Sequence, residues 1–308
     1  MTDFPKPEVI LTHESDLDGF VSGVLLQRLA TKMFDSVPRL EAWNYNAWAK
    51  RTLSEKSAWI CDLSFEQRMD REDWVICDHH ITEAKATHAR FIHDTTKSAS
   101  LICYDLCREQ GLGSEPLDRL VRLTDIGDLF KENDPDFLTA CDYGSLVKVY
   151  GFWNLHALIG GELERLLDHP LLEVMIVKRR VEDPMGYDWS RPNIRPLSPE
   201  VGLVETVVGN PNAIIHRLLN EKATSHAVLL TLSARANRTF SVSLRSQNGE
   251  ALVVARQLQG GGHPNACGAT LPKSIQSEAD AIDYLKHILS NKSSQAGLSS
   301  LADAFKGL

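Results

Sequence analysis

Three short apolar segments, each ending in acidic or histidine side chains, constrain the first hundred residues of this 308-residue chain. The segments are 9–12, 58–61 and 74–77, and the last runs directly into the tripeptide Asp-His-His at 78–80. Short apolar runs bounded by polar residues are typical of buried parallel strands. In an open parallel sheet, ligands bind outside the carboxyl ends of the strands. The pattern therefore predicts a ligand or metal site at this sheet edge.

The residue types at this edge favour a metal site. Carboxylates and imidazoles suit manganese, magnesium, iron or zinc. Because the cluster itself contains no cysteine, a closed structural zinc site is disfavoured. His13, Asp16 and Asp18 share one strand-to-helix turn, where alternate side chains can face two ions, and Asp62 on a neighbouring strand end can bridge them. Two ions roughly 3.5–4 Å apart clamp the attacking and leaving oxygens in phosphoryl hydrolysis. The predicted metal ligands are His13, Asp16, Asp18, Asp62, His79 and Asp125.

The first half of the chain alternates between strand and helix patterns. Such alternation predicts an α/β N-terminal domain with a parallel sheet and flanking helices. The longest helical pattern, 154–181, is expected to break at 160–161 and 169–170. The expected strands are 9–12, 40–43, 58–61, 74–77 and 90–93, and further helices are expected over 20–33, 100–110 and 117–123.

A change of composition separates the second half. Segment 182–199 is rich in Pro, Asp and Arg, which indicates a linker. The pattern beyond it predicts a smaller C-terminal α/β domain, with the active site in the cleft between the domains. The expected elements are strands 202–208, 227–233 and 239–245 and helices 210–219, 250–258 and 277–289. The predicted boundaries are 1–185 for the metal-binding catalytic domain, 186–200 for the linker and 201–308 for the substrate-binding domain.

A glycine run in the second half is a candidate phosphate-binding loop. Gly260, Gly261 and Gly262 precede His263. Without Cβ atoms, their backbone N–H groups can approach an anion closely. Taken alone, the run is better explained by an ordinary tight turn, whereas beside the upstream motifs a phosphate-binding loop is favoured. Beside it, Arg245 and His263 are predicted to hold a phosphate and Ser246 to add a hydroxyl donor, while Arg245 as a plain exposed strand end is the alternative.

Bulk composition sets limits on partners and location. The net charge of −8 argues against long-range attraction to nucleic acid. It does not exclude phosphate ligands, because bound divalent cations reverse the local field. No stretch is long and apolar enough for a membrane span, and the first residues carry no basic-then-apolar signal. We therefore expect no membrane partner and a cytoplasmic location.

Jointly, these motifs resemble the DHH phosphoesterase superfamily, in the branch that carries the DHH-associated C-terminal domain. That branch includes nanoRNases (oligoribonucleases), RecJ-type exonucleases, phosphatases of adenosine bisphosphate and hydrolases of cyclic or linear dinucleotides. The matching pieces occur in the family's order and span nearly the whole chain. They are His13 with Asp16-Leu17-Asp18-Gly19, Asp62, Asp78-His79-His80, Asp125, and Gly260-Gly261-Gly262-His263 with Ala266-Cys267-Gly268.

The resemblance implies a two-manganese site, with magnesium as the alternative ion. It places His13, Asp16 and Asp62 on one ion and Asp18, Asp62, His79 and Asp125 on the other. It further implies that Asp78 orients a ligand and that His80 faces the scissile phosphate. The last acidic ligand in this set could be either Asp125 or Asp128. Asp125 is preferred because Asp-x-Gly resembles the nanoRNase pattern.

The expected function is metal-dependent hydrolysis of phosphoester bonds in a small nucleotide substrate. Short oligonucleotides, linear or cyclic dinucleotides and nucleoside bisphosphates are the candidate substrates. Two alternatives remain open: a nucleotide-binding sensor without turnover, and a polyphosphate or pyrophosphate hydrolase that ignores nucleobases. Whether the protein forms a homodimer is open as well.

Overall fold

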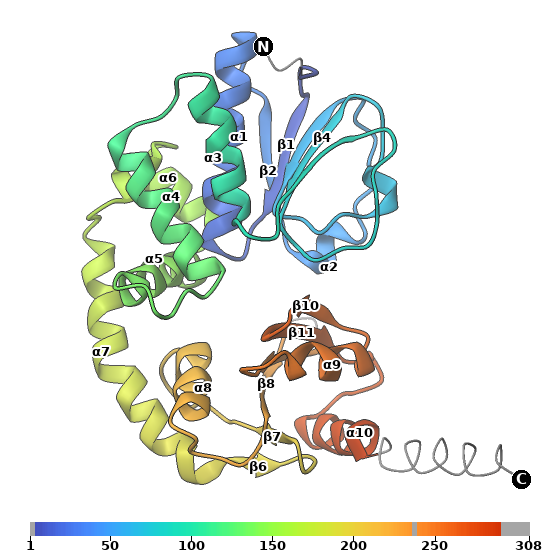
Figure 1. Ribbon diagram of the computed structural model, residues 1–308, viewed down its shortest axis with the longest axis vertical. Coiled ribbons are helices and arrows are strands. Elements are labelled where there is room, and N and C mark those ends of the chain that lie inside the picture. The colour runs from blue at the N-terminus through green and yellow to red at the C-terminus, as the bar shows by residue number, and fades with distance from the viewer. Residues whose placement is uncertain (1–3, 236–238, 291–308) are drawn as a thin grey trace, which may run out of the picture. The chain divides into compact units, whose positions relative to one another are not determined.

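The computed structural model describes residues 4–235 and 239–290. Backbone contacts divide the chain into two compact units, Met1–Val177 and Lys178–Leu308, each with its own sheet (Figure 1). The predicted boundaries of 1–185, 186–200 and 201–308 stay predictions.

Unit 1 is built on a parallel sheet of five strands in the order β2-β1-β3-β4-β5. Every neighbouring pair in this sheet is parallel, as the apolar segments predicted. All five expected strands are present. They are β1 (Val9–His13), β2 (Arg39–Trp43), β3 (Ala58–Cys61), β4 (Trp74–Asp78) and β5 (Arg90–His93).

Both faces of this sheet are buried. Successive strand residues point to opposite sides, so each central strand contributes side chains to two cores. Ile10, Trp59 and Val75 belong to one core with helices α1, α3 and α4, which lie on one side of the sheet in Figure 1. Val9 and Ile60 belong to a second core with the segment around α2 and η1. The covering elements are α1 (Leu17–Phe34), α3 (Ala99–Glu109) and α4 (Glu115–Asp128) on the first face, and α2 (Tyr45–Trp48) and η1 (Gln67–Met69) on the second.

The helical region after α4 differs in part from the expectation. The sequence did not single out α5, and the long pattern 154–181 divides at the expected places, with Gly160 and Gly161 at φ values of 63° and 73°. Helix α7 then continues through Pro184 and covers the first part of the predicted linker. The elements are α5 (Phe137–Tyr150), α6 (Phe152–Ile159), η2 (Leu163–Leu166) and α7 (Leu171–Ser190).

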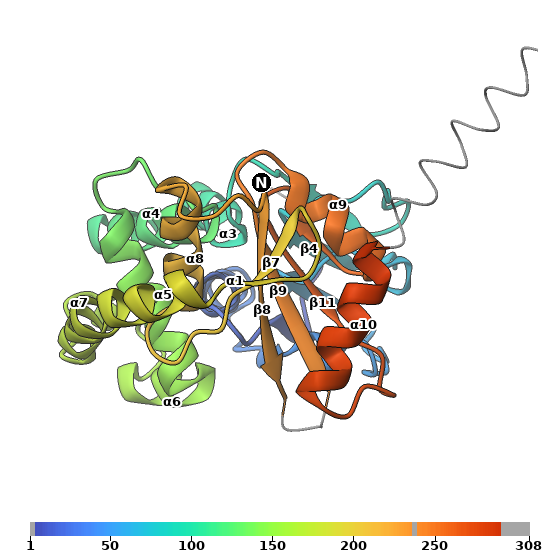
Figure 2. The same cartoon turned by 90° about the horizontal axis from the view of Figure 1, so that it is seen from below.

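Unit 2 contains a six-stranded sheet in the order β10-β11-β9-β8-β7-β6, in which only the β7–β8 pair is parallel. Helices α9 and α10 cover one face and α8 the other (Figure 2). The expected strand 202–208 is shorter than predicted. The elements are η3 (Arg191–Asn193), β6 (Arg195–Pro196), β7 (Val201–Leu203), α8 (Pro211–Asn220), β8 (Val228–Ala234), β9 (Phe240–Arg245), α9 (Glu250–Gln257), β10 (Gly261–His263), β11 (Ala266–Thr270) and α10 (Glu278–Ser290).

The expected fold class is confirmed. A parallel-sheet unit with flanking helices is followed by a second, smaller α/β unit. Among the residues that the structure describes, no helix is both long and apolar enough to span a bilayer.

Candidate metal centre

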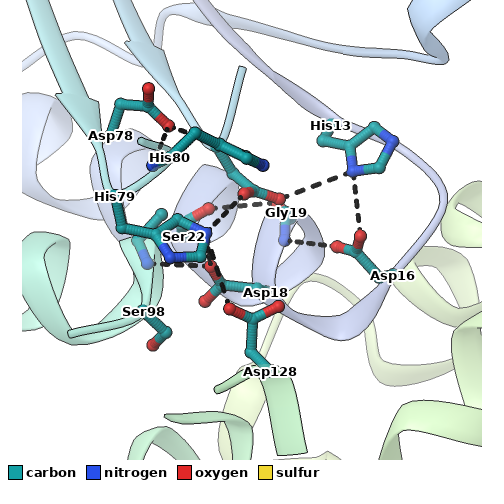
Figure 3. Close-up of polar contacts among 12 residues, drawn as sticks. His13, Asp16, Asp18, Gly19, Ser22, Asp78, His79, His80, Ser98 and Asp128 are labelled. Carbon is teal, nitrogen blue, oxygen red and sulfur yellow. Dashed lines mark hydrogen bonds and ion pairs between the residues drawn. The ribbon is translucent and has the colours of Figure 1, made fainter. Parts of the chain in front are cut away.

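The candidate site lies where strands β1, β3 and β4 end side by side. Register pairs Thr12 with Cys61 and Cys61 with Cys77, so the next residues of each strand meet at one edge. Acidic and imidazole groups are thus gathered from segments far apart in the sequence. Figure 3 shows His13 and Asp16 facing each other, with His79, Asp18 and Asp128 grouped beside them.

Asp62 lies between these two groups. Its Oδ2 is 3.5 Å from Nδ1 of His13, and its Oδ1 is 3.4 Å from Nε2 of His79. The residue is buried and its backbone adopts a left-handed conformation with φ of 54°, which aspartate tolerates better than most residues. Each carboxylate oxygen therefore faces a different histidine, which is the geometry of a bridging ligand.

The first group consists of His13, Asp16 and Asp62. Nδ1 of His13 is 2.9 Å from Oδ2 of Asp16, and one ligand atom from each residue lies within 4.8 Å of the others. Burial lowers the pKa of His13, but the Asp16 and Asp62 carboxylates outweigh it and raise the pKa to about 11. Burial likewise raises the pKa of Asp16, but His13, the Gly19 N–H and the Lys148 ammonium bring it well below its usual range.

The second group surrounds Nε2 of His79. That atom lies 3.4 Å from Oδ2 of Asp128 and 3.7 Å from Oδ2 of Asp18, in addition to its contact with Asp62. Burial lowers the pKa of His79, but Asp62, Asp128 and Asp18 raise it to about 10. Burial raises the pKa of Asp18, and so does repulsion by the neighbouring Asp62 carboxylate, which together bring it to about 6. A divalent cation bound here would relieve this repulsion and take the place of the protons.

Asp128, rather than Asp125, lies beside His79. Asp125 also comes from α4, but its Oδ1 accepts the Ser98 N–H at 2.8 Å and its Oδ2 pairs with the Lys131 ammonium. Asp128 is placed near the end of the same helix, where its Oδ2 is buried without a hydrogen-bond donor among the described residues. Both oxygens of Asp125 thus have protein partners, whereas Asp128 is the carboxylate of α4 that lies next to His79.

Asp78 and His80 form a pair next to the two groups. Oδ1 of Asp78 is 2.7 Å from Nδ1 of His80, and Oδ2 of Asp78 accepts the Phe65 N–H at 3.3 Å. The hydroxyl of Tyr45 lies 3.3 Å from Nε2 of His80, and the Tyr45 ring packs against His13. Burial lowers the pKa of His80, but Asp78 raises it above its usual value. Tyr45 is thus a residue of this site that the sequence analysis did not identify.

A close approach of α1 to β1 positions the first ligands. Asp16 caps α1 by accepting the Gly19 N–H at 3.0 Å, and the Thr12 hydroxyl donates to the Gly19 carbonyl at 2.5 Å. A Cβ atom at Gly19 would lie only 2.1 Å from the His13 carbonyl oxygen. Asp18 in the first turn accepts the N–H groups of Ala99 and Ser100, each at 2.8 Å. These contacts hold the turn between β1 and α1.

The predicted substrate-binding residues lie together in unit 2. Arg245 ends β9 and pairs with Ala266 of β11, and β11 pairs with β10 of the glycine motif. Burial lowers the pKa of Arg245. Ser246 has local partners, since its hydroxyl lies 3.1 Å from Oδ1 of Asn265 and accepts the Ala251 N–H at 2.9 Å.

The three glycines of the motif differ in their surroundings. A Cβ at Gly260 would lie 2.2 Å from the Gly268 carbonyl oxygen, and one at Gly262, whose φ is 135°, would lie 2.6 Å from the Ala266 carbonyl oxygen. A Cβ at Gly261 would meet nothing within 4 Å. Packing in the hairpin therefore explains Gly260 and Gly262 but not Gly261.

The donor set fits divalent cations. Carboxylate and imidazole groups predominate. Within the described part of the chain, the buried Oδ2 atoms of Asp62 and Asp128 face the ring nitrogens of His13 and His79 at 3.5 Å and 3.4 Å but accept no hydrogen bond. A buried carboxylate oxygen without a donor is costly unless a cation satisfies it. The two acidic and histidine groups therefore have the chemistry of metal sites, and the identity of the ion is a separate question.

Comparison with known proteins identifies the second unit. Residues 204–291 match the family model described as the DHHA1 domain. The chain carries a DHHA1 domain. For residues 204–291, the resemblance to proteins with the DHH-associated C-terminal domain is thereby confirmed. Comparison with curated proteins gives no significant match.

Solved structures share the fold at low sequence identity. A pGpG-specific phosphodiesterase, PggH from Vibrio cholerae, is 14% identical, with a TM-score of 0.54 over 92% of this chain and 99% of that chain. An exopolyphosphatase-related protein from Bacteroides fragilis is 12% identical, with a TM-score of 0.49 over 93% of this chain and 94% of that chain. At such identities the first likeness supports a common fold for nearly the whole chain.

Proposed function

We propose that this protein is a two-metal phosphohydrolase that cleaves phosphoester bonds in short oligonucleotides, dinucleotides or nucleoside bisphosphates. The position of Asp62 carries the proposal. Its two buried oxygens lie 3.5 Å and 3.4 Å from histidines that belong to separate acidic groups. A carboxylate shared between two ions is the arrangement expected in centres that hydrolyse phosphoesters.

Each ion has its own proposed ligands. His13, Asp16 and Asp62 hold one, while Asp18, Asp62, His79 and Asp128 hold the other, with Asp128 replacing the expected Asp125. Manganese is the proposed ion and magnesium the alternative, because oxygen ligands with some imidazole suit both. When bound, the ions supply Lewis acidity toward phosphoryl oxygens and lower the pKa of water. Asp18 is oriented for this role by the two N–H groups at the start of α3.

His80 is proposed to contact the scissile phosphate. Asp78 accepts a hydrogen bond from Nδ1 of His80, which fixes the ring and leaves Nε2 to act on the substrate. Although burial lowers the pKa of His80, the Asp78 carboxylate raises it above its usual value and so favours the protonated imidazole, whose Nε2 can donate a hydrogen bond to a phosphoryl oxygen. The Tyr45 hydroxyl beside Nε2 holds the ring in the same orientation.

The proposed substrate contacts of unit 2 are Arg245, Ser246, His263 and the three glycines, Gly260, Gly261 and Gly262. Gly261 is the strongest of the three glycine candidates, since its open surroundings allow a ligand to approach the backbone. Ser246 is the weakest proposal, because its hydroxyl already caps the start of α9. The cleft between the domains, a cytoplasmic location and a homodimer stay predictions.

Product release from a panel of substrates tests this function. The panel contains a 5′-phosphorylated dinucleotide, a five-mer RNA, cyclic dinucleotides, adenosine bisphosphate and polyphosphate, each with manganese and with a chelator. The fold shared with a pGpG-specific phosphodiesterase makes the dinucleotide the first member to assay. We expect manganese-dependent cleavage of a nucleotide. Bound but uncleaved nucleotides would favour the sensor, and cleavage of polyphosphate alone would favour the polyphosphate hydrolase.

A further inference from the structure

A cavity of about 510 Å³ adjoins the candidate metal centre within unit 1. It is lined by the β1–α1 turn, the end of α5 and the start of α6. Glu14 and Ser15 of its lining stand between His13 and Asp16 in the sequence, so the cavity lies against the turn that carries two residues of the first ligand group. Its other lining residues include Lys148, Trp153 and Asn154. Its volume is within the range of cavities that take small molecules.

Lys148 gives this cavity an available cation. It is exposed and makes no ion pair or hydrogen bond with any residue in the described ranges, whereas Lys97 and Lys131 are each paired with a carboxylate. Glu14 is the carboxylate in the same lining, and its Oε1 accepts a hydrogen bond from Asn44 at 2.8 Å. An exposed ammonium group that forms no hydrogen bond or ion pair within the described ranges, beside a proposed phosphoester site, is suited to bind a phosphate.

Trp153 adds an aromatic face to the cavity. Its side chain is 47% exposed although it packs against Phe152 and His156 at centroid distances of 4.9 Å and 5.8 Å. The exposed part of the ring therefore presents an aromatic surface at the cavity. Indole rings stack on nucleobases without selecting strongly among them.

We propose that this cavity is a nucleotide subsite, in which Lys148 binds a phosphate that flanks the scissile one and Trp153 stacks on the base. The inference deepens the proposed function and rests on it for the position of the scissile phosphate. It names the substrate class as a nucleotide with at least one phosphate beyond the bond that is cleaved. A phosphate chain without bases gains nothing from Trp153.

Binding to the intact chain tests the subsite without turnover. A 5′-phosphorylated dinucleotide is titrated into the protein in the presence of a chelator and, separately, of manganese at low temperature. We expect Lys148→Gln and Trp153→Ala each to weaken binding roughly tenfold. The matched controls are Lys32→Gln, at the far end of α1, and Trp189→Ala, an exposed tryptophan of α7, which should bind like the wild type.

Steady-state kinetics separate this inference from the proposed function. The Michaelis constant for the dinucleotide should rise in Lys148→Gln and Trp153→Ala by more than that for bis(p-nitrophenyl) phosphate, which has no base or second phosphate. Equal dinucleotide binding by the wild type and both variants overturns the subsite, even where cleavage is observed. Weakened binding in a protein that cleaves neither substrate overturns the hydrolase and keeps the subsite.

Discussion

Asp62 shows how a single residue can be strained and functional together. Its left-handed backbone, φ 54°, directs the carboxylate between His13 and His79 while its N–H still donates to the Cys77 carbonyl at 3.2 Å. Unusual backbone conformations persist where the surrounding structure determines them, often at functional sites. Asparagine tolerates this conformation as well, so Asp62→Asn removes the charge and keeps the backbone.

The assignment of Asp128 in place of Asp125 leads to a prediction at this scale. Asp128→Asn should lower kcat about 100-fold with manganese, because a carboxylate beside His79 is lost. Asp125→Asn should instead lower the free energy of unfolding by about 1–3 kcal/mol, because Asp125 bonds Ser98 and Lys131. Kinetics and urea unfolding of both variants measure the difference. A kcat loss in Asp125→Asn with full activity in Asp128→Asn would return the assignment to Asp125.

Sequence reasoning found most candidates at this scale but could not choose between these two. Asp125 and Asp128 are three residues apart, so they lie on one face of α4. Spacing alone cannot separate them. The choice depends on Ser98 and Lys131, whose contacts with Asp125 appear only in the fold. Tyr45 was not identified as a site residue for the same reason, because its partner His80 is distant in the sequence.

At the scale of elements, the approach of α1 to β1 requires two glycines. A Cβ at Gly19 would lie 2.1 Å from the His13 carbonyl oxygen, and one at Gly23 would lie 2.6 Å from Cγ2 of Thr12. Gly144, in the interior of α5, has nothing within 4 Å of its Cβ position. Substitution by alanine is therefore expected to lower the stability of the fold at the glycines of α1 and to raise it at Gly144 of α5.

Denaturant unfolding of two glycine variants tests this difference. Gly19→Ala should cost about 1–3 kcal/mol and weaken manganese binding, because the first turn of α1 must move away from β1. Gly144→Ala should stabilise by roughly 0.5–1 kcal/mol, since alanine loses less backbone entropy in a helix. A destabilised Gly144→Ala, or a Gly19→Ala protein as stable as the wild type, would refute the packing argument.

Elements with strong local patterns could be predicted from the sequence, and those decided by distant packing could not. The five strands of unit 1 are short apolar runs, and each was expected. Helix α5 was not singled out, because its apolar residues show little helical periodicity. Segment 182–199 was read as a linker from its Pro content, yet α7 continues through Pro184. Burial of Tyr187 with Val204 and Ile214 offsets the lost helical hydrogen bond.

At the scale of the whole molecule, a buried ion pair predicts how stability depends on pH. Glu55 pairs with Arg51, and this contact lowers the pKa of Glu55 from 4.5 to about 2 although burial opposes it. A carboxyl whose folded pKa is depressed stabilises the fold above its unfolded pKa. This contribution should be complete above pH 4.5 and disappear as pH falls from 4.5 to 2.

Replacement of Arg51 tests that dependence. Arg51→Met should lower the unfolding free energy at pH 7 by about 3 kcal/mol, because Glu55 stays buried without its partner. The difference from the wild type should shrink as pH falls toward 2. Arg39→Met is the matched control, since Arg39 is 65% exposed and should contribute little. Parallel stability curves for the wild type and Arg51→Met across this pH range would disprove the assignment.

The number of manganese ions bound per chain tests the two-metal centre most directly. It is measured by elemental analysis of protein dialysed against manganese, with electron paramagnetic resonance to detect coupling between the ions. We predict two ions and a coupled signal in the wild type, and at most one tight ion without coupling in Asp62→Asn. Fewer than two ions in the wild type, or an unchanged coupled pair in Asp62→Asn, would contradict the two-metal site bridged by Asp62.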